Sequence, residues 1–373
     1  MVGAGHAHLG VLAHAAGFAR RGVELVVVTP EARFWYSGLA TGVLGGRYPV
    51  ALDVVDVGAL AARGGGRCLA DTVVSFDPRA RRMRLAGGGE LTYDVCSLDV
   101  GSTVACDAVP GAVSHGVPVK PVGNLAALRG VLVERGAAGT LGDVVVAGAG
   151  ASGVEVAANV DGLLRRHGLR AAVTVVGRRV LPGLPPRAAR GVVRALAGRG
   201  VEVRGEAEVQ AVEPGRVLLD GGAVRFGLLV MATGLAAAPL ARASGLPVDD
   251  DGALLTDEFL RSNGDPAVFG GGDAIAFRGS ALARIGVHAV RQAPVLAANL
   301  LATLDGRPPT AFLPQRRWLL VMNLGDGTAL ATRGRFHHQG RLAWRLKDRI
   351  DRRWMARWHA LARVGSSDAA PPS

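Results

Sequence analysis

"GDVVVAGAGASGVEVAANV", residues 142–160, is the stretch of sequence that decides the fold. A β-branched run leads into Gly148, Gly150 and Gly153, spaced as G-x-G-x-x-G, and a helical pattern follows. Such a loop lets backbone N–H groups at a helix N-terminus approach a pyrophosphate. The run "AAVTVVGRR", residues 171–179, supplies the next strand. The stretch therefore predicts a Rossmann-type unit that binds a dinucleotide.

The N-terminus repeats this order in "MVGAGHAHLG", residues 1–10. A second glycine loop precedes a helical pattern from His8 to Arg20, and the strand "VELVVV" follows at 23–28. His8 stands where the third glycine would be, which indicates a wider helix–strand approach, a specific role, or an ordinary helix-start residue. Only two residues precede the loop, whereas a central strand usually needs about five.

Two later segments support a duplication. "YDVCSLDVGS" (93–102) and "RFGLLVMATG" (225–234) each read as a polar start, a buried strand and a closing glycine, at similar distances from their own loops. Two nucleotide-binding units in tandem explain this pattern. We therefore predict an α/β fold with two Rossmann-like domains.

A third signal is Gly272-Asp273, which is followed by the helical pattern of residues 286–304. A carboxylate in that setting can bind a ribityl hydroxyl while the helix N-terminus points at a flavin. Elsewhere, residues 72–94 read as an antiparallel meander, and Asp326-Gly327 within 316–336 is a hairpin signal.

Composition narrows the class of protein. The 373 residues are 49% apolar and 20% charged, which is typical of a globular protein. Three cysteines without a C-x-x-C exclude a disulfide framework and a zinc ribbon and favour a reducing compartment. No stretch reads as a signal peptide or membrane span, and no metal site is predicted.

Taken together, these motifs resemble the pyridine nucleotide–disulfide oxidoreductase superfamily, whose members are flavoproteins with two dinucleotide-binding domains. "GAGHAHL", "FWYSGLATGVLGGRYP" and "VHAVRQAPVLAANL" resemble its type II NADH dehydrogenase-like branch, especially the group associated with selenide, water dikinase. The resemblance implies a discontinuous FAD domain (1–110 and 236–312), an inserted NAD(P) domain (111–235), and a C-terminal hairpin with a basic amphipathic helix (313–373).

The resemblance also implies an activity. NAD(P)H gives a hydride to FAD, and the electrons pass to a quinone or similar small acceptor. Two alternatives stay open: a reductase or oxidase of a specialised pathway with a non-quinone acceptor, and a non-catalytic flavin redox sensor. Disulfide reductases and sulfide:quinone reductases need well-placed cysteines, which this sequence lacks. With so short a stretch before the first loop, we expect a natural start further upstream or weakly held FAD.

The family's site residues carry over by position. The residues implied in catalysis are Glu155, Gln292 and Lys120. Those implied for FAD are Gly3, Gly5, His6, Ala7, Glu31, Ser37, Gly101, Asp273 and Ala293. Those implied for NAD(P) are Gly148, Gly150, Gly153, Arg178, Arg179 and Gly234. The two arginines suit the 2′-phosphate of NADPH, or they are merely solvated, so NADPH and NADH both remain candidates. Asp99 departs from the Ala usual in the family motif, and His288 stands in place of an aromatic residue.

The tail is strongly basic: residues 333–363 hold ten basic residues against two acidic ones, in a chain of net charge +12. Within 341–362, one helical stripe carries apolar residues, and basic residues that include Lys347 cover much of the remaining, solvated surface. The stripe is Leu346, Ile350, Trp354, Trp358 and Leu361. A basic amphipathic helix of this kind suits an anionic membrane surface. The alternative is that the stripe packs on the body or on a second subunit of a homodimer. No nucleic-acid motif accompanies the charge, so we expect a cytoplasmic protein, peripheral on the inner face of the membrane.

Overall fold

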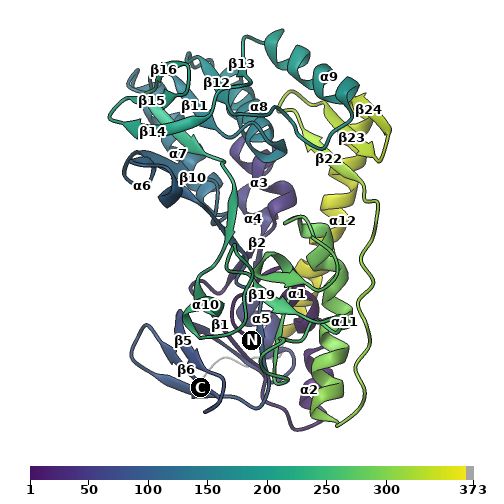
Figure 1. Ribbon diagram of the computed structural model, residues 1–373. Coiled ribbons are helices and arrows are strands. Elements are labelled where there is room, and N and C mark those ends of the chain that lie inside the picture. Colours follow the sequence, from purple (N-terminus) through teal and green to yellow (C-terminus); the bar gives the residue numbers. More distant parts are fainter. Residues whose placement is uncertain (367–373) are drawn as a thin grey trace.

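The second nucleotide-binding unit is a five-stranded parallel sheet. The computed structural model describes residues 1–366, and Figure 1 shows this unit at one end of the molecule. Its strands, in spatial order, are β10 (Gly116–Pro118), β17 (Leu228–Met231), β11 (Val144–Ala147), β12 (Val173–Val176) and β13 (Glu202–Arg204). Strands β17, β11 and β12 are buried along their whole length, as a parallel sheet covered on both faces requires. The predicted Rossmann unit is confirmed.

The first unit is built from shorter pieces around Val2. Strand β1 (Val26–Thr29) pairs in parallel with β4 (Arg67–Ala70), and β8 (Cys96–Leu98) pairs in parallel with β20 (Val268–Gly270). Val2 forms parallel bridges to both β1 and β8 and so joins the two pairs into one sheet. Its N–H donates to the Ser97 carbonyl at 2.8 Å, and its carbonyl accepts from Asp99 N at 2.9 Å. The central-strand position before the first glycine loop is therefore held by Met1 and Val2.

The single helix expected from His8 to Arg20 is wrong, because two helices are present: α1 (His6–Leu12) and α2 (Ala15–Ala19). At the break, the His14 ring Nδ1 donates to the Gly10 carbonyl at 2.9 Å. That carbonyl would otherwise accept the backbone N–H of His14, which bonds the Val11 carbonyl at 2.9 Å instead. A side chain thus competes with the backbone and ends the first helix.

Several smaller sheets accompany the sheets of the two nucleotide-binding units. The predicted meander is confirmed as β5 (Val73–Asp77), β6 (Arg82–Leu85) and β7 (Glu90–Thr92). The predicted hairpin is confirmed as β22 (Leu320–Asn323) and β23 (Ala329–Arg333), with β24 (Phe336–Gly340) as third strand. The remaining strands are β2 (Arg33–Trp35), β3 (Val54–Asp56), β9 (Ser102–Val104), β14 (Val209–Glu213), β15 (Arg216–Leu219), β16 (Gly222–Arg225), β18 (Leu235–Ala237), β19 (Leu254–Thr256) and β21 (Ile275–Phe277).

Helices fill the space around and between the two units. The main ones are α3 (Ser37–Leu44), α7 (Asn124–Ala137), α8 (Ala151–Arg166), α9 (Pro186–Ala197), α11 (Gly286–Leu304) and α12 (Arg341–Ser366). The short ones are α4 (Val50–Asp53), α5 (Val57–Ala62), α6 (Ala112–His115) and α10 (Leu240–Ala243). Helix α3 belongs to the N-terminal unit by sequence but packs on α7 and α8 of the second unit. The two units are therefore in contact through α3.

Helix α12 runs along one side of the molecule from the β22–β24 sheet to α5 and β3 of the first unit (Figure 1). The apolar stripe predicted along it is not one surface. Trp358 is only 4% exposed, whereas Leu346 and Ile350 are 44% and 43% exposed. Lys347, expected among the solvated residues, is buried. Helix α12 contacts the β22–β24 sheet in one part and α5 and β3 in another. Different sides of the helix are therefore buried along its length, and the predicted stripe is buried only in part.

Candidate functional site

The second glycine loop packs closely on its own strand and helix at Gly148 and Gly153, and it has open space at Gly150. Gly148 has φ +118°, and a Cβ there would collide with the Ala232 carbonyl. A Cβ on Gly153 would collide with the Gly148 carbonyl, so helix α8 approaches its strand closely. Gly150, the N-cap of α8, has nothing within 4 Å of the position of a Cβ. The loop therefore offers free N–H groups at a helix N-terminus, which fits a pyrophosphate.

The surroundings of this loop suit the rest of a dinucleotide. Gly234 also faces open space, and the buried Thr233 Oγ1 has no hydrogen-bond partner among residues 1–366. Arg178 and Arg179 are exposed just after β12, at the same edge of the sheet as the loop. The Arg178 guanidinium lies 3.8 Å from the Glu208 carboxylate, a loose surface pair. In a Rossmann unit, residues at this position contact the adenosine ribose of a bound dinucleotide.

The first glycine loop differs from the second because an acidic side chain, Asp99, lies against it. Gly3 has φ +84°, and Gly5 is the N-cap of α1. A Cβ on Gly5 would collide with the Asp99 carboxylate, and Oδ2 of Asp99 accepts from the N–H of His8 at 2.9 Å. Burial raises the pKa of Asp99 to about 7, although hydrogen bonds from His8 and Ala7 oppose that rise. A carboxyl group of this chain thus already bonds the start of α1.

His8 has a specific role in closing that loop. It is fully buried, with Nδ1 2.7 Å from the Gly3 carbonyl and Nε2 2.8 Å from the Ser97 hydroxyl. Burial lowers the pKa of His8 to about 3, so the ring is neutral. Because a carbonyl only accepts, Nδ1 carries the proton and Nε2 accepts from Ser97. The ring takes the space that a third glycine would leave and ties the loop to β8.

Lys120, Asp273 and Ser102 form a compact polar cluster. Lys120 Nζ lies 2.6 Å from Asp273 Oδ2 and 2.6 Å from Ser102 Oγ, and Ser102 Oγ donates to Asp273 Oδ2 at 2.7 Å. Two of these residues were predicted from the sequence and are brought together. Ser102 was missed, although it directly follows Gly101, which has φ +71° and open space around it.

Gln292 is aimed at the same region from α11. It is fully buried, and its Oε1 accepts from the N–H of Gly272 at 2.7 Å. Its Nε2, like His6 Nε2, is buried without a hydrogen-bond partner within residues 1–366. Buried polar groups are normally paired, so these two donors or acceptors fit a polar ring system such as a flavin. The residues present therefore fit FAD, with Asp99 as the one departure.

His6 stands in an aromatic cluster that joins α12 to the first loop. Its ring centroid lies 4.8 Å from that of Phe34 and 5.9 Å from that of Trp354, and Trp354 stacks on Tyr36 at 4.3 Å. Burial lowers the pKa of His6 to about 4. The neutral ring and its aromatic neighbours make one wall of the site.

Glu155 lies elsewhere, between α8, α3 and β22. It is half-buried; its Oε1 accepts from Thr41 Oγ1 at 3.1 Å and from the N–H of Asn323 at 2.8 Å. Burial raises its pKa. No motif pointed to Thr41 as a partner of Glu155, whereas Asn323 could have been noticed as a polar residue at the end of an apolar run.

A buried ionic group next to Glu155 was not foreseen at all. Lys347 Nζ donates to Asp351 Oδ2 at 2.8 Å and to the Gly38 carbonyl at 2.6 Å, and Tyr36 OH donates to Asp351 Oδ1 at 2.9 Å. Asp53 faces this group with both carboxyl oxygens unpartnered within residues 1–366. Burial, and then the charge of Asp351, raise the pKa of Asp53 to about 8.

Comparison with known proteins decides the family. The family model described as pyridine nucleotide-disulphide oxidoreductase matches residues 1–295. The chain belongs to this family. An NADH dehydrogenase-like protein of Mycobacterium tuberculosis is 32% identical over 219 residues, which are 55% of this chain and 54% of the relative. A demethylphylloquinone reductase of Synechocystis is 27% identical over 257 residues, 66% of this chain and 61% of the relative. The chain spans about half the length of the first of these curated relatives.

Solved structures of the same fold cover nearly all of the chain. NDH2 from Plasmodium falciparum in complex with NADH has a TM-score of 0.84 at 14% identity, covering 98% of this chain and 96% of that one. The sulfide:quinone oxidoreductase from Aquifex aeolicus has a TM-score of 0.79 at 14% identity, covering 96% and 91%. These likenesses confirm the predicted fold class.

The other residues carried over from this oxidoreductase family lie around the first loop. Glu31 is exposed beyond β1, where its Oε2 accepts from Trp35 Nε1 at 3.2 Å, and it lines a hollow of about 530 Å³. Ser37 is exposed at the start of α3. Ala293 is buried, and a Cβ on Gly10 would collide with its side chain, so it packs α11 on α1. Ala7 is fully buried at the start of α1.

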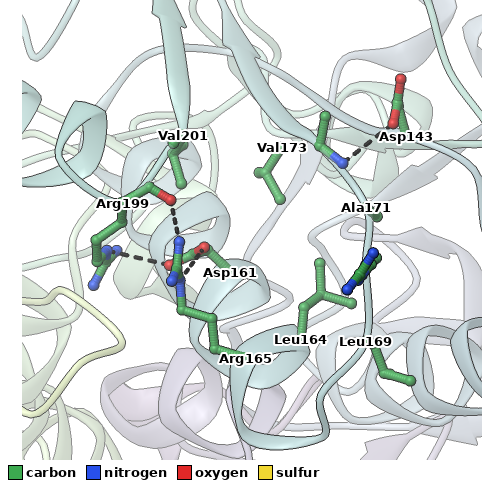
Figure 2. A pocket seen from close by; sticks show the side chains of 12 residues that line it. Asp143, Asp161, Leu164, Arg165, Leu169, Ala171, Val173, Arg199 and Val201 are labelled. Atoms are coloured by element: carbon green, nitrogen blue, oxygen red, sulfur yellow. Dashed lines mark hydrogen bonds and ion pairs between the residues drawn. The ribbon is translucent and has the colours of Figure 1, made fainter.

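A second hollow, of about 560 Å³, belongs to the second unit and is shown in Figure 2. Asp161 accepts from Arg165 at 2.8 Å there and pairs with Arg199 at 3.2 Å. Its walls include Asp143 and Val173, where strands β11 and β12 begin. The glycine loop lies at the opposite ends of these strands, and no predicted site residue lines the hollow. It is therefore separate from the nucleotide site.

Within residues 1–366, no group of three or more His, Cys, Asp or Glu side chains is arranged to hold a metal ion. Among the helices described, none is both long and apolar enough to span a membrane.

Proposed function

We propose that this protein is an FAD-dependent NAD(P)H oxidoreductase that passes electrons to a quinone or a similar small acceptor. The observation that carries the proposal is the cluster of Lys120, Asp273 and Ser102 beside Gln292, whose amide Nε2 is buried and unpartnered. Relatives named for quinone chemistry support it: the demethylphylloquinone reductase, and an alternative NAD(P)H-ubiquinone oxidoreductase of Arabidopsis thaliana that is 26% identical over 281 residues.

In this proposal each loop holds one nucleotide. Gly3, Gly5 and the start of α1 would hold the FAD pyrophosphate. Asp273, which Lys120 holds at 2.6 Å, would accept from the ribityl chain. Gln292 Nε2 donates to the flavin or the acceptor. Bound FAD supplies the ability to take a hydride from the nicotinamide and pass on its electrons. The protein positions the two reactants and excludes water from their contact.

The acceptor is better matched by a quinone than by a disulfide. The three cysteines all lie in the described residues and are free, with Cys96 and Cys106 buried. Burial raises the pKa of the Cys96 thiol to about 11, which makes it a poor nucleophile. Glu155, in a buried setting that favours its neutral form, is the residue we place between the nicotinamide and acceptor sites.

Finer assignments are also part of the proposal. The motifs quoted from the sequence support the selenide, water dikinase-associated group. The positions of Arg178 and Arg179 support NADPH over NADH. The domain boundaries at 110/111 and 235/236 are supported by the strands, because β10, β11, β12, β13 and β17 build one sheet. Strands β1, β4, β8 and β20 build the other, joined through Val2. The boundary at 312/313 is part of the proposal as well.

The exposed face of α12 supports peripheral attachment to an anionic membrane, on its cytoplasmic side. Leu342, Leu346 and Ile350 are 66%, 44% and 43% exposed and lie one turn apart. Arg345, Arg349 and Arg353 are exposed around them. We expect sedimentation with phosphatidylglycerol vesicles, and loss of it in Leu346→Gln/Ile350→Gln. Equal sedimentation of both proteins would contradict attachment through this face and leave packing in a homodimer as its use.

Whether the purified protein retains FAD is the first test of the proposal. We expect purified protein, supplied with FAD and gel-filtered, to release FAD on denaturation in about a one-to-one ratio, identified by chromatography. Asp273→Ala is expected to release far less. A wild-type protein that retains no flavin under these conditions would overturn the proposal.

A further inference from the structure

Helices α3, α7 and α8 pack on one another, and α8 also packs on β22. Three arginines from this junction, Arg47, Arg129 and Arg166, influence one another electrostatically. Arg129 Nη2 and Arg166 Nε each lie 3.8 Å from the position of a Cβ on Gly46, so the two nitrogens are no farther apart than twice that distance. Arg47 is the next residue in the chain. Gly46 has φ +71°, and the atoms nearest the position of its Cβ are Leu163 Cδ1, at 3.2 Å, and the two arginine nitrogens.

These arginines repel one another. Burial lowers the pKa of Arg166, and the charges of Arg47 and Arg129 lower it further. Within residues 1–366, none of the three has a carboxylate at ion-pair distance, although other arginines nearby do. Arg165 and Arg199 pair with Asp161, and Arg352 pairs with Asp348. The charge of Asp161 opposes this shift but does not cancel it. Like charges held together with an incomplete counter-charge destabilise the fold unless an anion binds.

Two of the three arginine side chains, those of Arg47 and Arg166, are held in place by other contacts. The Arg47 guanidinium lies over the ring of Trp344 at 5.7 Å, and its Nε is buried without a partner in the described part of the chain. Arg166 Nη1 donates to the Gly325 carbonyl at 3.1 Å. Side chains that are already ordered lose little entropy when they bind a ligand.

We propose that Arg47, Arg129 and Arg166 form a binding site for a phosphate group, carried by a lipid headgroup or by a soluble phosphate compound. An oxyanion that accepts charge-assisted hydrogen bonds of about 2.7–2.9 Å from two sides bridges a gap of this size. Guanidinium forks match phosphate oxygens, which explains the use of arginine at all three positions. The site is separate from the NADPH phosphate, because Arg166 closes α8 at the end opposite to the glycine loop.

The test compares the full chain with Arg129→Gln/Arg166→Gln. A control, Arg187→Gln/Arg190→Gln, removes the same charge from the exposed face of α9. Inorganic phosphate is titrated by calorimetry and by thermal unfolding at an ionic strength held constant with chloride. Phosphate that binds at the glycine loops does so equally in the wild type, the variant and the control, so its effect cancels when they are compared.

We expect phosphate to raise the Tm of the wild type and of the control more than that of the Arg129/Arg166 variant, in which the phosphate Kd of this site rises at least about tenfold. Without phosphate, the variant should unfold no earlier than the wild type, because repulsion is removed. Arg129→Lys/Arg166→Lys, which keeps the charges without the forks, should bind with intermediate affinity. An equal phosphate response in wild type and Gln variant would overturn the proposal.

Vesicles distinguish the two sources of phosphate. If the Gln variant also loses binding to phosphatidylglycerol vesicles, the ligand is a headgroup. If vesicle binding is unchanged while phosphate binding is lost, it is a soluble phosphate compound. None of these measurements uses flavin or NAD(P)H, so their outcome is independent of the proposed activity.

Discussion

Lys120 Nζ lies 2.6 Å from Oδ2 of Asp273, and this ion pair joins the segment that enters the second unit to the last loop of the first. Both side chains are largely buried, with exposed fractions of 22% and 14%. The pair therefore connects the orientation of the two units to the position of the carboxylate that we assign to FAD.

Replacing Lys120 tests that connection. In Lys120→Met the Asp273 carboxylate keeps only Ser102, and an incompletely paired buried charge costs about 1–3 kcal/mol. We expect the FAD Kd to rise about tenfold or more, measured from the fluorescence of released flavin. Lys120→Arg should retain most of the affinity, and unchanged FAD binding in Lys120→Met would show that the pair does not hold the cofactor.

Glu155 should make electron transfer to the acceptor depend on pH. Burial raises its pKa, so the charge of the wild-type side chain changes at higher pH than that of an ordinary glutamate. In Glu155→Gln the N–H of Asn323 still has an acceptor, but the titration is gone. We expect flavin reoxidation by a quinone to lose this pH dependence in Glu155→Gln. The exposed Glu134→Gln serves as control, and an identical pH profile in all three proteins would remove Glu155 from that role.

Arg178 and Arg179 should select the nucleotide. Both are exposed at the carboxyl edge of the second sheet, so their effect falls on a phosphate that reaches them from solvent. In Arg178→Ala/Arg179→Ala we expect the KM for NADPH to rise about tenfold while the KM for NADH changes little. Arg187→Ala/Arg190→Ala controls for net charge. Equal changes with both nucleotides would mean that the arginines are only solvated.

Asp53 should make the fold less stable as the pH rises. Its folded pKa of about 8 lies above the ordinary value of 3.8. The proton therefore stabilises the folded state fully below pH 3.8, and this contribution is lost as the pH rises to about 8, by up to about 1.4 kcal/mol per unit. We expect Asp53→Asn to unfold at higher denaturant than the wild type at pH 8 and to lose this advantage near pH 4. The exposed Asp94→Asn should behave as the wild type, and a constant difference between Asp53→Asn and the wild type would contradict burial of a lone carboxyl group.

Local signals in the sequence predicted most of the fold. Helix α11 spans the expected residues 286–304, and the hairpin at Asp326-Gly327 is present, because glycine positions and apolar periodicity act over a few neighbouring residues. The break at His14 was missed because it depends on one side chain reaching the carbonyl four residues before it.

The site was predicted less completely, for a physical reason. Lys120 and Asp273 were both identified by their motifs, but their direct pairing, and Ser102 between them, come from tertiary packing. Lys347 was expected on a solvated face and is instead buried against Asp351 and Gly38. A sequence pattern gives the spacing of residues on a helix, whereas the neighbours that cover each face are set by the rest of the fold.

Stopped-flow absorbance of the flavin tests the central claim most directly. The protein loaded with FAD is mixed without oxygen with NADPH or NADH, and a soluble quinone is added in a second mixing step. We predict that the oxidised flavin absorbance is lost with at least one nucleotide and returns with the quinone. Loss without return would favour another acceptor, and absorbance that neither nucleotide changes would contradict the account and leave a flavin sensor in its place.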